Sequence, residues 1–142
     1  QPGIPNAFGL VGAAANAIAP GKRPLSSMSP TLLLRQGHPV LSVGAAGGPT
    51  IISQTLLAIL RTVDFGQDPA DALRGPRFHH QWRPDELHVE AALGEAVIEA
   101  LRSKGHTVIV ERSLGAAQAV GVESGALVGA ADPRSEGAAA GW

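Results

Sequence analysis

Apolar residues early in the chain form two short runs separated by a glycine turn. Residues 31–35 and 39–43 are rich in Leu and Val, and Gln36-Gly37-His38 stands between them. Glycine readily adopts the positive φ that a tight turn needs, so this pattern predicts a β-hairpin. A strand with one solvated face alternates apolar and polar residues, whereas these runs are nearly continuous. They therefore predict a sheet that is covered on both faces.

After residue 48 the apolar positions change to a helical period. Their spacing of three or four residues predicts a mostly buried helix over about 49–63. The positions expected to face inward are Ile52, Leu56, Ile59 and Val63, and Ile51, Leu57 and Leu60 widen that face. Further along, the pattern predicts a short helix over 68–75, strands over 77–82 and 87–90, and a helix over 94–104. A strand over 107–110 and a hairpin over 118–130 follow.

Helices mixed with hairpins in a chain of 142 residues indicate a single domain of the α+β class. Residues 1–24 contain eight Pro and Gly residues and show no steady period, which predicts a long loop. Long loops in compact domains are commonly functional lids. We therefore divide the domain 1–142 into a lid-like loop over 1–24 and an α/β body over 25–142.

Composition excludes several classes of function. Eleven basic and twelve acidic residues give a net charge of −1 with no basic block, which argues against nucleic-acid binding. No apolar run approaches the roughly 20 residues of a membrane-spanning helix. The chain has no cysteine. Neighbouring residues in a strand point to opposite faces, so His79 and His80 do not form a metal site. We expect no metal and no cofactor.

Two segments carry groups that suit an anion. The adjacent hydroxyls of Ser26 and Ser27 could hold a carboxylate, or they could bond their own backbone in a Ser/Pro turn. Gly47 and Gly48 end a glycine-rich turn between a predicted strand and helix. Its backbone N–H groups could stabilise an oxyanion in acyl transfer, or the segment could simply be a tight turn. We also expect Asp132-Pro133-Arg134 to form a local ion pair that anchors a loop.

Several of these segments together resemble the γ-glutamyltranspeptidase family. The resemblance covers nearly the whole chain, and its blocks occur in the family's order and spacing. They are residues 16–31 with Ser26-Ser27-Met28-Ser29-Pro30, 44–48, 76–87 with Arg77-Phe78-His79-His80-Gln81-Trp82, 129–134, and the Ala-Ala-Gly-aromatic ending. The family's members are N-terminal-nucleophile hydrolases with an αββα sandwich of largely antiparallel sheets. Their precursor cuts itself into a large and a small subunit, and a Thr begins the small subunit. That Thr is the nucleophile and its own α-amine is the base.

The resemblance implies roles for particular residues. Ser26 and Ser27 match the serines that hold the α-carboxylate of the γ-glutamyl group. Gly47 and Gly48 match the oxyanion-hole glycines, and Gly48 also contacts substrate. Residues 2–13 match the loop that covers the glutamyl pocket, and Phe8 stands where many members have a tyrosine. A latch that needs a tyrosine hydroxyl is therefore not expected here.

The resemblance further implies that the chain is the C-terminal part of a small subunit, whose partner is the large subunit of the same precursor. The expected substrates are small γ-glutamyl compounds such as glutathione, and the expected compartment is periplasmic or extracellular. Gln1 cannot serve as the N-terminal nucleophile, so we expect the isolated chain to be inactive. Two alternatives remain: a non-catalytic binding or assembly domain on the same scaffold, and an acylase for glutaryl-type β-lactam side chains.

Overall fold

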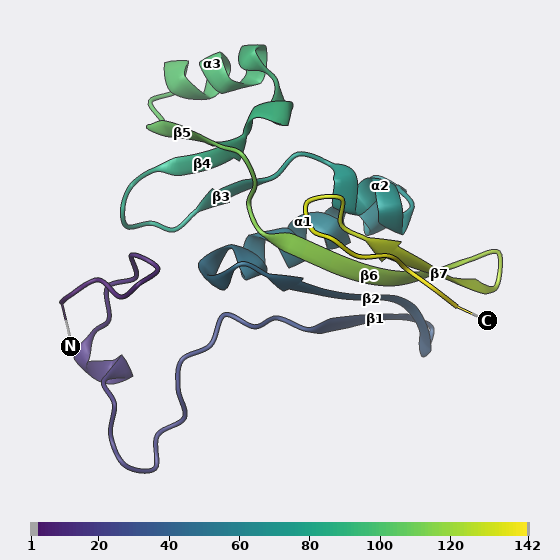
Figure 1. Cartoon of the computed structure of the whole chain (residues 1–142), viewed down its shortest axis with the longest axis horizontal. Helices are drawn as coiled ribbons and strands as arrows, with labels where there is room; N and C mark the ends of the chain where they lie inside the picture. The colour runs from purple at the N-terminus through teal and green to yellow at the C-terminus, as the bar shows by residue number, and fades with distance from the viewer. Residues whose placement is uncertain (1–2, 142) are drawn as a thin grey trace.

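A computed structural model describes residues 3–141 and contains two sheets (Figure 1). The larger sheet has the antiparallel order β1 (Thr31–Arg35), β2 (His38–Ala46), β6 (Ala116–Glu123), β7 (Ala126–Ala131). The smaller sheet has the order β3 (Phe78–His80), β4 (Leu87–Glu90), β5 (Val108–Glu111), with β4 and β5 parallel. The helices are α1 (Ile51–Val63), α2 (Pro69–Arg74) and α3 (Glu95–Ser103). Short 3₁₀ turns cover Ala14–Asn16, Gly48–Thr50 and Ala91–Leu93. The predicted mixture of helices and hairpins is confirmed.

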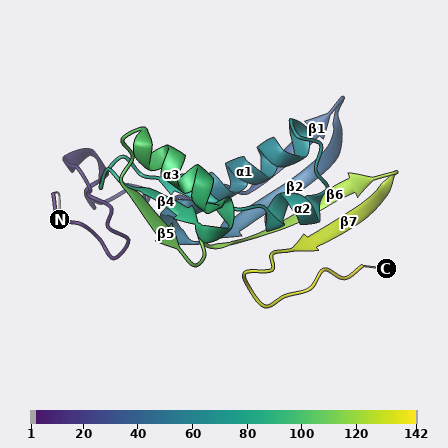
Figure 2. The ribbon, with the colours of Figure 1, turned by 90° about the horizontal axis from the view of Figure 1, so that it is seen from above.

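Both predicted hairpins form where the sequence places their turns. Gln36 and Gly37 have φ values of 52° and 82°, the positive values that a two-residue hairpin turn requires at both central positions. The first residue (Gln1), the start of the expected lid (Pro2) and the aromatic ending (Trp142) lie outside the described residues. Figure 2 shows the N-terminal loop at the end of the molecule that carries the small sheet, with the C-terminal tail alongside β7.

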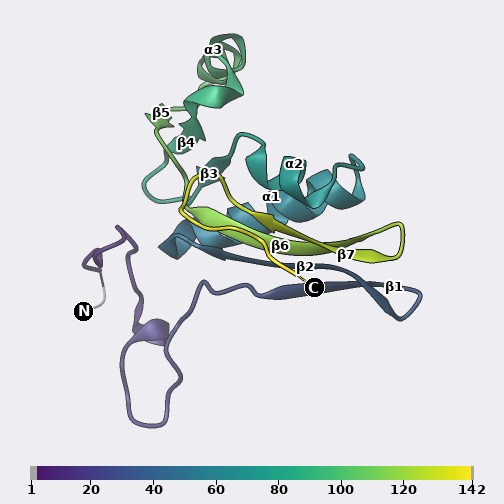
Figure 3. The same ribbon diagram turned by 45° about the vertical axis from the view of Figure 1, so that its right-hand side comes forward.

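The main core lies between the larger sheet and helices α1 and α2, which occupy one side of it (Figure 3). Its buried residues are Leu41, Val43, Ala58, Leu73, Ala117, Ala119 and Ala130. The many alanines let the helices approach the strands closely. A second, smaller cluster of Leu87, Val89 and Ile98 packs α3 against the small sheet.

The expectation that both faces of the larger sheet are covered is wrong for residues 3–141. Leu32, Val120 and Leu127 are 59%, 43% and 80% exposed. The C-terminal tail approaches this sheet where Ala139 packs on Gly129. The continuous apolar runs correctly predict a hydrophobic surface on this sheet, but a sequence pattern does not identify which segment lies against that surface.

The inward face predicted for α1 is wrong in part: the flanking Ile51 and Leu57 are buried, but the centre of the predicted face is not. Ile52 and Leu56 are 55% and 53% exposed, whereas the polar Gln54 and Thr55 are buried. The helix is rotated so that Gln54 faces the charged residues described next. Hydrophobic periodicity ranked a polar residue as outward, and the partner that makes its burial favourable is distant in sequence.

Four buried or nearly buried charged side chains join the two sheets to α2. Arg77 pairs with Asp132 just after β7, and their side chains are 2% and 0% exposed. Arg134 donates two hydrogen bonds, of 2.7 and 2.5 Å, to the carboxylate of Glu90 at the end of β4. Glu90 also accepts the backbone N–H groups of Arg77 and Leu114, at 2.9 and 3.0 Å. The predicted anchoring role of Asp132 and Arg134 is confirmed, and it extends well beyond a local loop.

The two carboxyl groups are held in their charged forms. Burial by itself raises the pKa of Asp132, but hydrogen bonds from the backbone N–H groups of Ala117 and Arg134 and from the Arg77 guanidinium outweigh it. The pKa of Asp132 therefore lies below its ordinary value. Burial likewise raises the pKa of Glu90, and the hydrogen bonds of Arg134 and two backbone N–H groups more than offset this.

We predict that Arg77→Met lowers the free energy of unfolding by about 3–5 kcal/mol, because the buried carboxylate of Asp132 loses the nearer of its two cations and keeps only Arg134, at 3.2 Å. The matched control is Arg74→Met. Arg74 pairs with Asp71 on the surface, where the side chains are 63% and 58% exposed, so less than about 1 kcal/mol should be lost. Urea unfolding of the two variants measures both values. Similar losses of unfolding free energy in the two variants would show that the buried pair stabilises the fold no more than the surface pair does.

Acid should weaken the fold through the same carboxylates. Their pKa values are lower in the folded state, so their contribution is fully present above the unfolded-state pKa values of about 4. It is lost as the pH falls through the lower folded-state values. We expect the melting temperature to drop steeply below about pH 4, with a shallower drop for Asp132→Asn and an unchanged slope for Asp71→Asn. Equal acid slopes in all three proteins would refute this account.

Candidate functional site

The turn between β2 and α1 presents unpaired backbone donors. Gly47 and Gly48 have φ values of 144° and 58°, a region that side chains rarely adopt. Within residues 3–141 the backbone N–H groups of these two glycines donate no hydrogen bond. They precede α1, where the helix dipole favours negative charge. The turn can therefore accept an anion or a developing oxyanion.

Gln54 holds this turn from below. Its side-chain amide donates to the Ala46 carbonyl at 3.1 Å and to the Thr50 hydroxyl at 2.9 Å, and that hydroxyl donates to the Gly47 carbonyl at 2.9 Å. The amide oxygen of Gln54 accepts a hydrogen bond from Arg77 at 3.2 Å. The turn is thus connected to the buried ion pair through one side chain, which the sequence analysis missed. A lone Gln within an apolar helix was the available signal.

The serine segment lies against the turn. The Ser27 hydroxyl donates to the Gly48 carbonyl at 2.8 Å, and the Ser26 hydroxyl oxygen accepts the Met28 backbone N–H at 3.1 Å. The Ser26 bond to its own segment is the one that the Ser/Pro-turn interpretation expects, whereas the Ser27 bond reaches the distant glycine turn. The hydrogen of the Ser26 hydroxyl stays available to an anion. Ser26, Ser27 and Gly48 line one cavity of about 730 Å³.

Phe8 covers the same turn. Its loop is shaped by the Asn6 side chain, which accepts the backbone N–H groups of Phe8 and Leu10 at 2.9 and 3.0 Å. A Cβ atom on Gly48 would lie 2.9 Å from the Phe8 ring, so the ring packs directly on the glycine. Phe8 is nevertheless 63% exposed. The N-terminal loop touches the turn through this ring, and its role as a lid stays a prediction.

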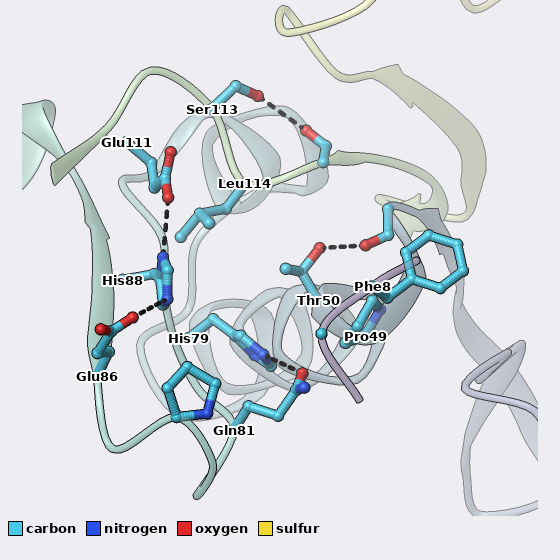
Figure 4. A pocket seen from close by; sticks show the side chains of 14 residues that line it. Phe8, Pro49, Thr50, His79, Gln81, Glu86, His88, Glu111, Ser113 and Leu114 are labelled. Carbon is cyan, nitrogen blue, oxygen red and sulfur yellow. Dashed lines mark hydrogen bonds and ion pairs between the residues drawn. The ribbon is translucent and has the colours of Figure 1, made fainter. Parts of the chain in front are cut away.

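A second cavity of about 420 Å³ lies beside the first (Figure 4). Gly47 belongs to its wall, and Gly48 belongs to the wall of the larger cavity. His88 lies between two carboxylates of this second cavity, 2.8 Å from Glu111 and 3.7 Å from Glu86. One side of the cavity is therefore acidic.

The neighbouring histidines separate as expected of a strand. His79 contacts Ser53 and Gln81, whereas His80 contacts the exposed Asp85 at 3.1 Å. In the described part of the chain no group of three His, Cys, Asp or Glu residues could hold a metal ion. No helix of that part is long and apolar enough to cross a membrane.

The sequence and the fold both match known proteins. A family model described as "Gamma-glutamyltranspeptidase" matches residues 1–142. The chain belongs to the γ-glutamyltranspeptidase family. It is 46% identical to the glutathione hydrolase proenzyme of Escherichia coli over 95% of its length. It spans only 23% of that relative, so the activity of a whole protein is a proposal here.

Solved structures confirm the fold that the family resemblance implied. The γ-glutamyltranspeptidase of Pseudomonas nitroreducens, complexed with L-DON, matches all of this chain with a TM-score of 0.91 and 38% identity, over 76% of its own length. A cephalosporin acylase from Bacillus halodurans matches 89% of the chain with a TM-score of 0.82 and 28% identity, over 24% of its own length. The chain therefore has the α+β fold of N-terminal-nucleophile hydrolases, with largely antiparallel sheets.

Proposed function

We propose that this chain is the C-terminal part of the small subunit of an enzyme that cleaves γ-glutamyl compounds such as glutathione. The observation that carries the proposal is the cavity in which Ser26 and Ser27 meet the turn of Gly47 and Gly48, whose N–H groups donate no hydrogen bond within residues 3–141. The serine hydroxyls suit the α-carboxylate of a glutamyl donor, and the glycine N–H groups suit the oxygen of its γ-carbonyl. The family membership supports this assignment.

The reaction divides between this chain and a Thr that another segment supplies. The Thr oxygen attacks the γ-carbonyl carbon, and the carbonyl oxygen gains negative charge that the Gly47 and Gly48 N–H groups stabilise. The C–N bond breaks, and the leaving amine takes the proton that the Thr gave to its own α-amine. Water or an amino acid then attacks the γ-glutamyl-Thr ester. Ser26 holds the donor by its α-carboxylate throughout, and Ser27 joins it when its hydroxyl turns from the Gly48 carbonyl toward that carboxylate.

The partner in this proposal is the large subunit of the same precursor, and the compartment is periplasmic or extracellular. The proenzyme name of the Escherichia coli relative supports a processed, two-part product. The phenyl ring of Phe8 would cover the glutamyl pocket by packing alone, because it has no hydroxyl. The isolated 142-residue chain serves as the inactive control in every assay below.

The glutaryl acylase alternative predicts a different donor. A glutaryl group keeps the carboxylate that Ser26 and Ser27 suit and lacks only the α-amino group, so the serines alone do not separate the two donors. Identity is lower to the cephalosporin acylase than to the γ-glutamyltranspeptidases, which favours the γ-glutamyl donor. Assays of the complete protein with γ-glutamyl and glutaryl anilides separate the two enzymes. Failure to release aniline from either one would favour the binding or assembly domain.

We predict that Gly48→Val in the complete, self-cleaved protein lowers kcat by about 10² or more, with a smaller change in KM. The new side chain meets the Phe8 ring and strains a backbone with φ of 58°, which moves the oxyanion donors. Gly44→Ala is the matched control, since nothing lies within 4 Å of its Cβ position. A Gly48→Val protein that melts early but turns over normally per active site would limit this glycine to a folding role.

Replacing the serine pair by alanine should weaken donor binding without blocking self-cleavage. A hydrogen bond to a charged group contributes about 1.5–3 kcal/mol, so Ser26→Ala with Ser27→Ala should raise the donor KM at least about tenfold. Ser26→Ala alone should act on KM. Ser27→Ala should also lower kcat, because its hydroxyl bonds the Gly48 carbonyl. Ser103→Ala, on the distant α3, is the control, and an unchanged KM in the double variant would remove the serines from the site.

A further inference from the structure

Three polar side chains form a hydrogen-bonded series beside the glycine turn. Ser53 lies on α1, His79 on β3, and Gln81 directly after β3. The Ser53 hydroxyl is 2.7 Å from Nδ1 of His79, and Nε2 of His79 is 3.1 Å from Oε1 of Gln81. Figure 4 shows the His79–Gln81 bond apart from the acidic pair of His88 and Glu111.

The chemistry of the Gln81 amide fixes the direction of this series. With the amide oxygen of Gln81 toward His79, Nε2 of His79 is the donor and its Nδ1 accepts the Ser53 hydroxyl hydrogen. The amide nitrogen of Gln81 is left with two N–H donors, and these have no partner within residues 3–141. The series therefore orients Gln81 as a donor of hydrogen bonds.

Gln81 stands where the two cavities meet. Four residues line both cavities: Phe8, Pro49, His79 and Gln81. Phe8 and Pro49 have apolar side chains, and both nitrogens of His79 are engaged. The Gln81 amide nitrogen is thus the unengaged polar side-chain group at this junction. Gly47 lines the smaller cavity and Gly48 lines the larger one, so their turn also lies between the two cavities.

We propose that Gln81, oriented by His79 and Ser53, binds the carboxylate of the amino acid or short peptide that accepts the γ-glutamyl group. This rests on the function proposed above. The donor's own carboxylate belongs with Ser26 and Ser27 in the larger cavity, so the acceptor approaches from the smaller one. Glu86 and Glu111 make its far wall anionic and direct a carboxylate toward Gln81.

Gln81 binds in this step and exchanges no proton. The acceptor's amine nitrogen attacks the ester carbon of the γ-glutamyl-Thr intermediate and forms a C–N bond. The bond from that carbon to the Thr oxygen breaks, and the proton lost by the amine ends on the Thr oxygen. Holding the acceptor's carboxylate orients its amine for the attack.

The test compares two acceptors in the complete, self-cleaved protein: glycylglycine, which has a carboxylate, and glycylglycinamide, which does not. Gln81→Glu replaces the amide donors by a like charge, so the KM for glycylglycine should rise at least about tenfold. The KM for glycylglycinamide should rise much less, so the ratio of the two KM values is the measured quantity. Gln67→Glu, the same change at an exposed loop position outside both cavities, should leave every constant unchanged.

The series itself is tested at Ser53. Ser53→Ala removes the hydroxyl and should raise the glycylglycine KM several-fold, and Ser53→Thr, which keeps a hydroxyl, should restore it. Equal effects of Gln81→Glu on both acceptors, or none, would overturn the inference. If Gln81→Glu fails to self-cleave, Gln81→Met carries the same prediction. A native protein that hydrolyses no γ-glutamyl anilide would instead overturn the proposed function.

Discussion

The arrangement of this molecule depends on the buried pair of Arg77 and Asp132. Two charges removed from water are costly unless each is paired and its remaining polar atoms are hydrogen-bonded. That condition is met because Arg77 also donates to the carbonyl of Leu73 in α2 at 3.2 Å and to that of Gly115 before β6 at 3.1 Å. Asp132 in turn accepts the N–H of Ala117 in β6 at 2.7 Å. Each partner is thus fixed to the elements around it, and a shift of any one would leave a buried charge unsatisfied.

This constraint reaches the candidate site through Gln54. The Gln54 amide accepts a hydrogen bond from Arg77 and donates to the carbonyl at the end of β2 and to the Thr50 hydroxyl. The ion pair therefore fixes the position of the glycine turn. Space around the turn is correspondingly small. A Cβ on Gly47 would lie 2.6 Å from the Thr50 hydroxyl, and one on Gly115 would lie 2.2 Å from the Gln54 amide. The direction of the Gly47 and Gly48 N–H groups is therefore fixed, because the side chains of Thr50 and Gln54 leave the turn no room to shift.

Local signals in the sequence sufficed for the hairpins and the helix limits. Gln36-Gly37 and Ser124-Gly125 are turns whose chemistry lies within a few residues. Features that join distant segments were not accessible in this way. The Ser27–Gly48 bond spans 21 residues and the Arg77–Asp132 pair spans 55. The buried side of α1 was assigned wrongly for the same reason, since Gln54 is inward only because Arg77 lies there.

The contact between Ser53 and His79 also has the geometry of a nucleophile and its base, and its surroundings argue against that role. In a Ser-His-Asp triad a carboxylate stabilises the imidazolium that forms as the serine loses its proton. Here the second nitrogen of His79 meets the amide oxygen of Gln81, which carries no charge to offset an imidazolium. The series therefore lacks the carboxylate that orients and supports the histidine of such a triad. It is suited to fixing the direction of hydrogen bonds at the wall of a binding site, which leaves covalent chemistry to a Thr whose own amine can take the proton.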